Sequence, residues 1–171
     1  DKFGPYYTEG FWGYRQYDLK NSRYQLTFGA DPIAANRQVS FSTKEWGKML
    51  DHTKVACVDP RFSSTAQKAD EWLPIKPGQD PALALALAHV ILVEGMWHKP
   101  FVGDFSDGVN RFKPGETVDE STFGELYTHG LVKWWNLELK DRTPEWAAKV
   151  TELPIEQILR VARELGAAAP R

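Results

Sequence analysis

KVACVDPRFSSTAQKADEWLPIKPGQD, residues 54–80, holds two short apolar runs with a polar segment between them. Residues 54–58 are bounded by polar neighbours, which is typical of a strand buried in a parallel sheet. Ser63 to Asp70 indicates a short helix. Glu71 to Lys76 indicates another strand, and its Pro74 favours an edge position or a short extended segment. The stretch therefore predicts two neighbouring strands joined by a helix.

One more strand is predicted upstream, over Ser22 to Gly29, because apolar and polar residues alternate there. The glycine allows a sharp turn, and a short helix over residues 33–39 is expected to begin after it, near Asp31. A longer helix over residues 43–52 follows, capped by Ser42 or Thr43. Strand, helix and strand at this spacing predict a βαβ unit with a right-handed crossover.

The second half of the chain is predicted to be mainly helical. Asp80 is expected to cap the clearest helix, ALALALAHVILV, which is apolar nearly all round and should be buried on most sides. Residues 103–130 have little periodicity and are expected to form a long excursion, either two-stranded or irregular. Two further helices are predicted after caps at Thr143 and Thr151, and the second is expected to end at Gly166.

Together these elements predict an α/β fold of the Rossmann-like type, with an open, mainly parallel sheet and helices on both faces in three layers (α/β/α). Residues 1–171 suit one domain. Residues 1–21 are rich in aromatic residues and glycine without periodicity, and are expected to form a loop. It is either a surface loop of this domain or, in the interpretation we favour, a segment that contacts other parts of a larger protein.

The composition argues against several classes of protein. A net charge of −2 over 171 residues offers no basic surface for nucleic acid and no polybasic patch for a membrane. The longest apolar run, residues 82–93, is too short to cross a bilayer. Cys57 is the one cysteine, so a disulfide within the chain and a cysteine-based metal site are both impossible. Its position inside a strand predicts a buried core residue.

The histidines and the acidic loop residues do not indicate a metal site. His89 lies on the apolar helix and is expected to be a core histidine, and His52, His98 and His129 share no ligand spacing. The sequence favours a solvated loop over a calcium site for the acidic residues Asp104, Asp107, Asp119 and Glu120. No residue of this chain is therefore predicted to be catalytic or to bind a metal.

Carboxylates follow the predicted strand ends. Asp31, Asp59 and Asp80 each lie beside a proline or glycine after a predicted strand, and Arg61 follows Asp59. Ligands of open α/β sheets bind at the carboxyl ends of the strands, near a switch in strand order. If the strands are parallel neighbours, these side chains converge on one edge of the sheet, which we call the rim.

The chemistry of these residues favours a guanine nucleotide. The glycine-rich dinucleotide fingerprint and the P-loop are absent, and a carboxylate at the start of a helix opposes a phosphate there. A carboxylate instead accepts hydrogen bonds, and guanine presents two adjacent donors, N1–H and the N2 amino group, which adenine lacks. Ribose hydroxyls are the other natural donors. The alternative is that Asp31 and Asp80 are only helix N-caps.

The run VDPRFSSTAQKADEWLPIKPGQDPALALALAHVILVEG, residues 58–95, resembles the signature of the molybdopterin oxidoreductase (dimethyl sulfoxide reductase) family. The match includes the DPR strand end, the TA and AD pairs, the PG-x-D turn and the Ala/Leu-rich helix. FGADP, residues 28–32, resembles the family's G-x-N-P turn, and residues 143–166 resemble the segment that closes the domain. Within the family, residues 4–40 are most similar to the reductases of arsenate, tetrathionate, thiosulfate and polysulfide.

This resemblance implies that the chain is a fragment of a catalytic subunit and binds the guanosine part of a bis-molybdopterin guanine dinucleotide cofactor. Asp59 and Asp80 would read the nucleoside, and Asp31 and Gln79 replace the family's common Asn and Thr. The implied cofactor-binding residues are Gly29, Asp31, Asp59, Arg61, Gly78, Gln79 and Asp80.

The resemblance also implies the setting of the whole enzyme. The metal is molybdenum, with tungsten as the alternative, and an iron–sulfur cluster lies in another part of the subunit. The expected partners are the remaining domains of the subunit, an iron–sulfur electron-transfer subunit and a membrane anchor subunit, at the periplasmic or extracytoplasmic face of the membrane. The fragment alone is expected to be inactive. The alternatives are a nicotinamide-type Rossmann dehydrogenase domain and a noncatalytic interaction module.

Overall fold

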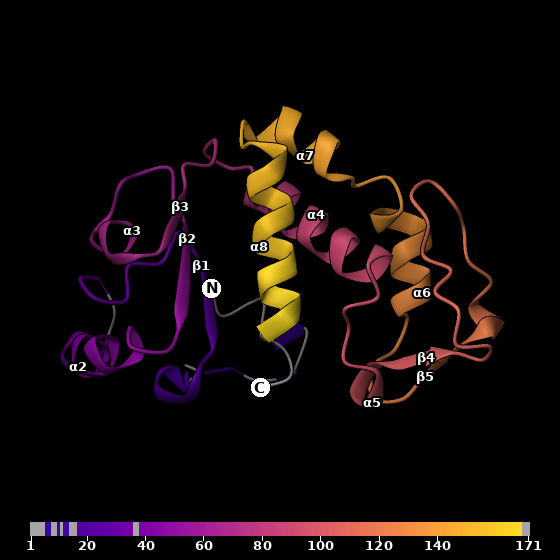
Figure 1. Ribbon diagram of the computed structural model, residues 1–171, viewed down its shortest axis with the longest axis horizontal. Helices are drawn as coiled ribbons and strands as arrows, with labels where there is room; N and C mark the ends of the chain where they lie inside the picture. The colour runs from indigo at the N-terminus through magenta and orange to yellow at the C-terminus, as the bar shows by residue number, and fades with distance from the viewer. Residues whose placement is uncertain (1–5, 8–9, 11, 14–16, 36–37, 169–171) are drawn as a thin grey trace.

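The computed structural model describes residues 6–7, 10, 12–13, 17–35 and 38–168. Figure 1 shows three regions side by side: a parallel sheet with helices α2 and α3, a central group of helices α4, α7 and α8, and a second lobe with α5, α6, β4 and β5. In the described residues, no helix is both long and apolar enough to cross a membrane.

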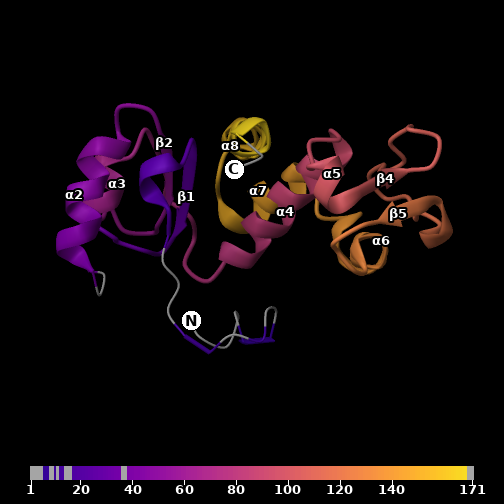
Figure 2. The ribbon, with the colours of Figure 1, turned by 90° about the horizontal axis from the view of Figure 1, so that it is seen from below.

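The sheet consists of β1 (Tyr24–Phe28), β2 (Lys54–Val58) and β3 (Glu71–Leu73), in that order and all parallel. Its two crossover helices, α2 (Val39–Met49) and α3 (Ser64–Lys68), lie on one face. The opposite face is covered by α8 (Ile155–Ala168), as Figure 2 shows. The predicted α/β fold with a parallel sheet between helices is confirmed.

The alternation of side chains in β2 divides the core into two parts. Val55 packs on the α2 side with Trp46 and Met49, whereas Ala56 and Val58 pack on the α8 side. All the residues of β2 after Lys54 are buried, which explains the continuous apolar run in the sequence.

Helix α4 (Asp80–Val93) connects the sheet region to the second lobe. It packs against α8 and α7 (Pro144–Thr151) and against the π-helical turn Trp135–Leu139. Leu83, Ala86, Leu87 and Val90 belong to the core beside the sheet, and Leu92 belongs to the core of the second lobe. Because α4 contributes to two cores, it needs apolar residues nearly all round.

The second lobe is built around an aromatic core. It contains α5 (Lys99–Val102), the antiparallel pair β4 (Gly103–Phe105) and β5 (Phe123–Glu125), the 3-10 turn Glu120–Thr122, and α6 (Leu131–Trp134). Its buried aromatic residues are Trp97, Phe105, Phe112, Phe123 and Trp135. Residues 103–130 therefore form the two-stranded version of the predicted excursion.

Most predicted elements are present, but several ends were wrong. Helix α2 begins at Val39, so Ser42 is a buried helical residue and not a cap. The helix predicted over residues 33–39 is wrong at its start, because residues 32–34 form a turn. Strand β3 ends at Leu73, before Pro74, because proline has no N–H for the ladder. Thr143 caps α7 as predicted, its hydroxyl accepting a hydrogen bond from the Trp146 N–H.

Two further predicted helix ends were also wrong. Thr151 is the last residue of α7, where its hydroxyl donates to the carbonyl oxygen of Ala147. Helix α8 starts later, at Ile155, and continues through Gly166 to Ala168. Gly166 lies against Met96, whose side-chain atoms would be about 3.0 Å from an added Cβ, so this glycine allows close packing instead of ending the helix.

The structure describes only some of the aromatic residues among residues 1–21. Tyr6, Tyr7, Trp12 and Tyr17 are described and are exposed. Residues 1–5, 8–9, 11 and 14–16 lie outside the described residues. The expectation that this segment contacts other parts of a larger protein stays a prediction.

Candidate nucleotide-binding site at the carboxyl ends of the strands

Three strands end together on one edge of the sheet. Phe28, Val58 and Leu73 are aligned in register. Beyond this row the Gly29 N–H donates to the Val58 carbonyl oxygen at 2.8 Å, and the Asp59 N–H donates to the Leu73 carbonyl oxygen at 3.2 Å. Gly29 and Asp59 therefore lie side by side at the rim, as the sequence predicts. The described strands follow one another in the order β1-β2-β3, so this sheet has no switch in strand order among them.

Asp59 is held firmly at the rim. The residue is 6% exposed, its Oδ1 atom accepts a hydrogen bond from the Arg61 N–H at 2.8 Å, and its carbonyl oxygen accepts one from Trp72 Nε1 at 2.8 Å. Its other carboxylate oxygen, Oδ2, has no hydrogen bond among the described residues. The side chain and the carbonyl oxygen of Asp59 are thus both held in place, while one carboxylate oxygen stays available to a ligand.

Asp31 has a structural partner that the sequence did not indicate. Its Oδ1 atom accepts hydrogen bonds from the N–H and the hydroxyl of Thr65, at 3.0 and 2.6 Å. Ser63 caps the same helix, since its hydroxyl accepts from the Ala66 N–H at 3.3 Å. Asp31 therefore acts as a cap, but of α3 and not of the helix that follows it in the sequence.

The third predicted group lies where α4 begins. Gln79 is the N-cap residue and Asp80 is the first helical residue, so the prediction that Asp80 is the cap was wrong by one position. Neither side chain has a hydrogen bond within the described part of the chain. Figure 1 shows α4 starting beside the upper end of the sheet, where the strands end. The start of α4 therefore lies near the end of the sheet at which the strands end.

The two glycines of the predicted site serve the backbone. Gly29 and Gly78 have φ values of +58° and +80°, in the left-handed region that favours glycine. A Cβ added to either residue would meet nothing within 4 Å. Their requirement is therefore conformational, since Gly29 turns the chain directly after β1 and Gly78 lies in the turn before α4.

Arg61, Phe62 and Trp72 complete the rim. Arg61 is exposed, and its guanidinium has no partner among the described residues. The ring of Phe62 lies 4.7 Å from that of Trp72 between centroids, and Phe62 is 53% exposed. Neither aromatic residue is among the site residues that the sequence predicts. The available signal was an apolar residue directly after Arg61 in an otherwise polar turn.

The remaining polar candidates have structural roles. Burial raises the pKa of the Cys57 thiol, which is fully buried as predicted. His89 is 2% exposed and its Nδ1 atom lies 2.7 Å from the Leu139 carbonyl oxygen, so it is the predicted core histidine. The described residues contain no group of three or more His, Cys, Asp or Glu side chains that could hold a metal ion.

The acidic loop residues are engaged by neighbours. The Lys99 ammonium lies 2.7 Å from Asp104 Oδ2 and lowers the pKa of that carboxyl. The Val109 N–H lowers the pKa of Asp107, and the Ser121 N–H lowers that of Asp119. Asp107 and Asp119 are exposed loop residues, as predicted, whereas Asp104 is a half-buried residue of β4 and Glu120 begins the 3-10 turn Glu120–Thr122.

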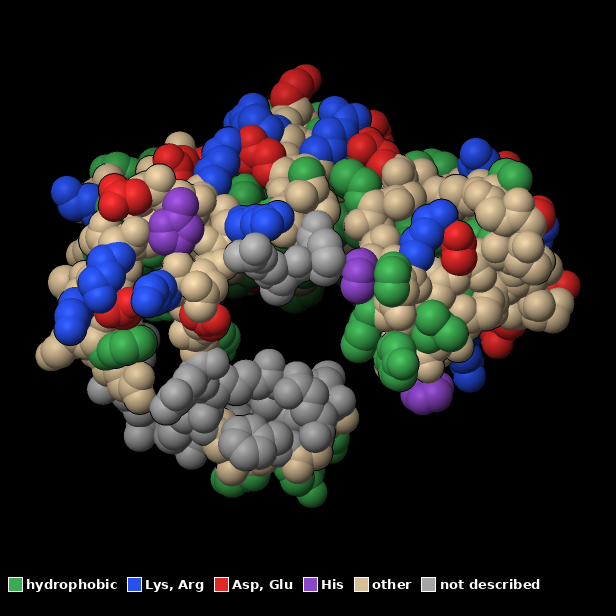
Figure 3. All heavy atoms as spheres, turned by 60° about the horizontal axis from the view of Figure 1, so that its bottom comes forward, with side chains coloured by type: hydrophobic (Ala, Val, Ile, Leu, Met, Phe, Trp, Pro, Cys, Tyr) green, Lys and Arg blue, Asp and Glu red, His purple; other side chains and the backbone are tan. Residues whose placement is uncertain are grey.

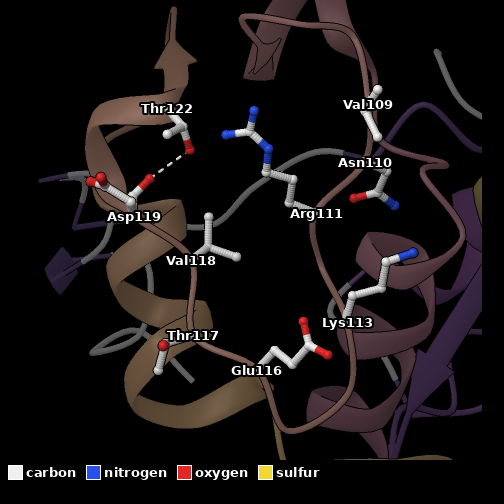
Figure 4. Close-up of a pocket in the computed structure, with 9 residues that line it drawn as sticks. All are labelled: Val109, Asn110, Arg111, Lys113, Glu116, Thr117, Val118, Asp119 and Thr122. Atoms are coloured by element: carbon white, nitrogen blue, oxygen red, sulfur yellow. Dashed lines mark hydrogen bonds between the residues drawn. The ribbon is translucent and has the colours of Figure 1, made fainter.

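A hollow of about 380 Å³ lies in the second lobe, away from the rim. Figure 4 shows its wall residues, which carry both signs of charge, with Arg111 reaching in from one side and Asp119 and Thr122 on the other. Arg111 forms an ion pair with Asp107, and the Thr122 hydroxyl donates to the Asp119 carbonyl oxygen at 2.7 Å. None of the predicted site residues lines it.

Comparison with known proteins points to one family. The model of the family described as molybdopterin oxidoreductase matches residues 8–131. The molybdopterin-containing subunits of the arsenate respiratory reductases of Shewanella sp. (strain ANA-3) and Chrysiogenes arsenatis are 61% and 55% identical to this chain over 169 and 170 residues. That of the thiosulfate reductase of Salmonella typhimurium (strain LT2) is 32% identical over 158 residues.

These matches cover nearly all of this chain but little of each relative. The arsenate reductase matches cover 99% of this chain, which spans about one fifth (20%) of the relatives' length, and the thiosulfate reductase match covers 90% of the chain and 17% of the relative. Among solved structures, acetylene hydratase from Pelobacter acetylenicus matches 90% of this chain and 18% of its own, with a TM-score of 0.66 and 21% identity. At that identity the match supports the fold alone.

Proposed function

Because the chain belongs to the molybdopterin oxidoreductase family, we propose that its rim binds the guanosine part of a molybdopterin guanine dinucleotide cofactor. The observation that carries the proposal is Asp59, a buried carboxylate at the strand ends with one oxygen left without a partner among the described residues. When bound, the cofactor supplies the metal at which the redox step of the enzyme takes place.

The side chains at the rim suit a nucleoside. A carboxylate accepts hydrogen bonds from two adjacent N–H donors or from ribose hydroxyls, and such charge-assisted bonds are each worth about 1.5–3 kcal/mol. Asp59 offers its Oδ2 atom, since Oδ1 already accepts from the Arg61 N–H. The Asp80 carboxylate and the Gln79 amide have no hydrogen bonds among the described residues. The exposed guanidinium of Arg61 suits a phosphate oxygen. Gly29 and Gly78 shape the loops that carry them, whereas Asp31 contributes through α3.

For the complete enzyme we propose respiratory reduction of an oxyanion, with arsenate as the favoured substrate. Identities of 61% and 55% to two arsenate respiratory reductases, against 32% to the thiosulfate reductase, support this choice. The remaining domains of the subunit would hold the metal ligand and an iron–sulfur cluster. An electron-transfer subunit and a membrane anchor subunit on the extracytoplasmic side would deliver electrons. We expect this chain alone to be inactive, because the proposed metal ligand lies in the remaining domains.

Nucleotide titration of the chain tests the rim. GMP should bind about tenfold more tightly than AMP, because only guanine presents two adjacent donors to a carboxylate. The substitution Asp59→Asn should remove this preference, since an amide cannot accept from both donors. Asp51→Asn is a matched control, because Asp51 is exposed and lies before β2, at the opposite end of the sheet. Equal binding of GMP and AMP by the unaltered chain contradicts the proposal.

A second measurement uses the full-length subunit. Acid treatment of the purified protein releases the nucleotide of its cofactor, and chromatography measures GMP per protein. Asp59→Asn and Asp80→Asn should lower this ratio, whereas Asp51→Asn should leave it unchanged. A full guanine content in both rim variants would argue against the proposed contacts, whatever the activity of the enzyme.

A further inference from the structure

An aromatic pair stands beside Asp59 at the rim. Phe62 lies in the loop after β2, and Trp72 lies in β3. The ring centroids are 4.7 Å apart with a tilt of 51°, and Phe62 remains 53% exposed although it touches Trp72. One part of the Phe62 ring is therefore covered by the indole while the rest faces solvent. The exposed part of a phenylalanine ring keeps apolar surface in contact with water. A ring that binds over it removes this surface from water, which is favourable.

Both aromatic residues are tied to the same carboxylate residue. Trp72 Nε1 donates to the Asp59 carbonyl oxygen at 2.8 Å, which fixes the indole relative to the rim. Phe62 directly follows Arg61, whose N–H donates to Asp59 Oδ1 at 2.8 Å, so the turn that presents Phe62 is closed by the Asp59 side chain. The backbone turn that carries Phe62 is thus held by the same residue that offers Oδ2.

We propose that Phe62, supported by Trp72, is the surface on which the purine base of the bound nucleotide stacks. This proposal rests on the proposed function and divides the recognition of the base between two residues. The Asp59 carboxylate selects guanine through its edge. The Phe62 ring supplies affinity through the face of the base, which is similar in all purines.

The division of roles gives a test that separates the two proposals. Phe62→Ala should weaken the binding of both GMP and AMP by about tenfold or more, since stacking of a base on an aromatic ring is sequence-tolerant. The ratio of the two affinities should stay that of the unaltered chain. Phe62→Tyr should restore both affinities, because the ring is retained. Asp59→Asn should change the ratio instead.

Phe101→Ala provides the matched control. Phe101 is also an exposed phenylalanine, at 52%, and stacks on Tyr127 with a centroid distance of 5.7 Å, but it lies in the second lobe. Its replacement should leave both affinities unchanged. Because Phe62 is exposed, its substitution should preserve the fold, which circular dichroism and thermal unfolding verify for each variant.

The possible failures are distinct. Affinities of Phe62→Ala within about twofold of the unaltered chain would overturn the stacking proposal while the GMP preference stood. Absence of any GMP preference in the unaltered chain would instead overturn the proposed function. In the full-length subunit, Phe62→Ala should also lower the acid-released GMP per protein, and unchanged guanine content there would count against the stacking surface.

Discussion

Asp31 Oδ1 accepts two hydrogen bonds from Thr65, one from its N–H at 3.0 Å and one from its hydroxyl at 2.6 Å. This pair joins the end of β1 to the first turn of α3, although the two residues are 34 positions apart in the chain. It fixes α3, and with it the loop after β2, relative to the first strand. A residue that the sequence places among the ligand contacts thus also holds the rim together.

The Asp31–Thr65 pair predicts unequal effects of two substitutions. Asp31→Ala removes both acceptor contacts at a half-buried site and should lower the free energy of unfolding by about 1–2 kcal/mol. Asp31→Asn keeps an oxygen that accepts from Thr65 and should cost less than about 1 kcal/mol. Chemical denaturation of the three proteins measures both values. Equal losses for Ala and Asn would show that the hydrogen bonds are not the source of the stability.

Because the Cys57 thiol is buried, we expect its alkylation to depend on pH and on unfolding of the protein. Burial raises its pKa, so the folded protein should resist alkylation at pH 8 and react only after denaturant is added. Above about pH 8.5 the unfolded chain ionises its thiol while the folded chain does not. Ionisation then favours unfolding, and stability falls as the pH rises.

Iodoacetamide labelling followed by mass spectrometry measures the reactivity of Cys57. The variant Cys57→Ser serves as the control for pH, since it has no thiol to ionise. Its free energy of unfolding should therefore fall less at alkaline pH than that of the unaltered protein. Rapid labelling of the folded protein at pH 8 would contradict the position of Cys57 in the core.

Two arginines of α8 form ion pairs that differ in burial. Arg160 pairs with Glu71, whose side chain is 9% exposed, whereas Arg163 pairs with Glu94, whose side chain is 32% exposed. Arg160→Met should lower the free energy of unfolding by about 1–3 kcal/mol, because it leaves a nearly buried carboxylate without its partner. Arg163→Met should cost less than about 1 kcal/mol, because water solvates Glu94.

Urea unfolding curves compare these two variants on the same helix. The double substitution of Glu71→Gln with Arg160→Met should recover part of the loss, because no buried charge remains. If Arg163→Met costs as much as Arg160→Met, the difference in burial does not decide the stability of these pairs.

Exposed hydrophobic side chains gather on the second lobe. Figure 3 shows this group beside two histidines, and Phe101, Leu126 and Tyr127 are 52%, 58% and 72% exposed. The isolated chain should therefore bind a hydrophobic dye and associate at high concentration. Tyr127→Ser combined with Leu126→Ser should reduce dye binding without loss of stability. A chain that binds no dye and stays monomeric would contradict this prediction.

Much of the fold follows from local patterns. The apolar run of β2, the Thr143 cap of α7 and the apolar helix α4 are where the sequence predicts them. The order of the strands also follows, since strands that are consecutive in sequence and joined by short connections pair side by side in most folds. The ends of helices were predicted less accurately. Residues such as Ser42 and Thr151 suit a cap or a helix, and their surroundings decide between the two.

The candidate site divides in the same way. The sequence alone identifies Asp59 and Gly29 as strand-end residues, because a carboxylate or glycine directly after an apolar run is a local feature. It also identifies the family, since residues 58–95 match a long and specific sequence motif of that family. The number of residues between one strand and the next can be read from the sequence and indicates parallel neighbouring strands, so the rim could be predicted.

Only the tertiary structure decided which of these side chains are free. Thr65 occupies one oxygen of Asp31, Arg61 and Trp72 hold Asp59, and Phe62 stands beside them. These partners come from different segments of the chain, so no local pattern encodes the pairings. Hydrogen bonds and ring contacts depend on directions that are set when β1, β2, β3 and α3 pack together, and that packing determines what remains available to a ligand.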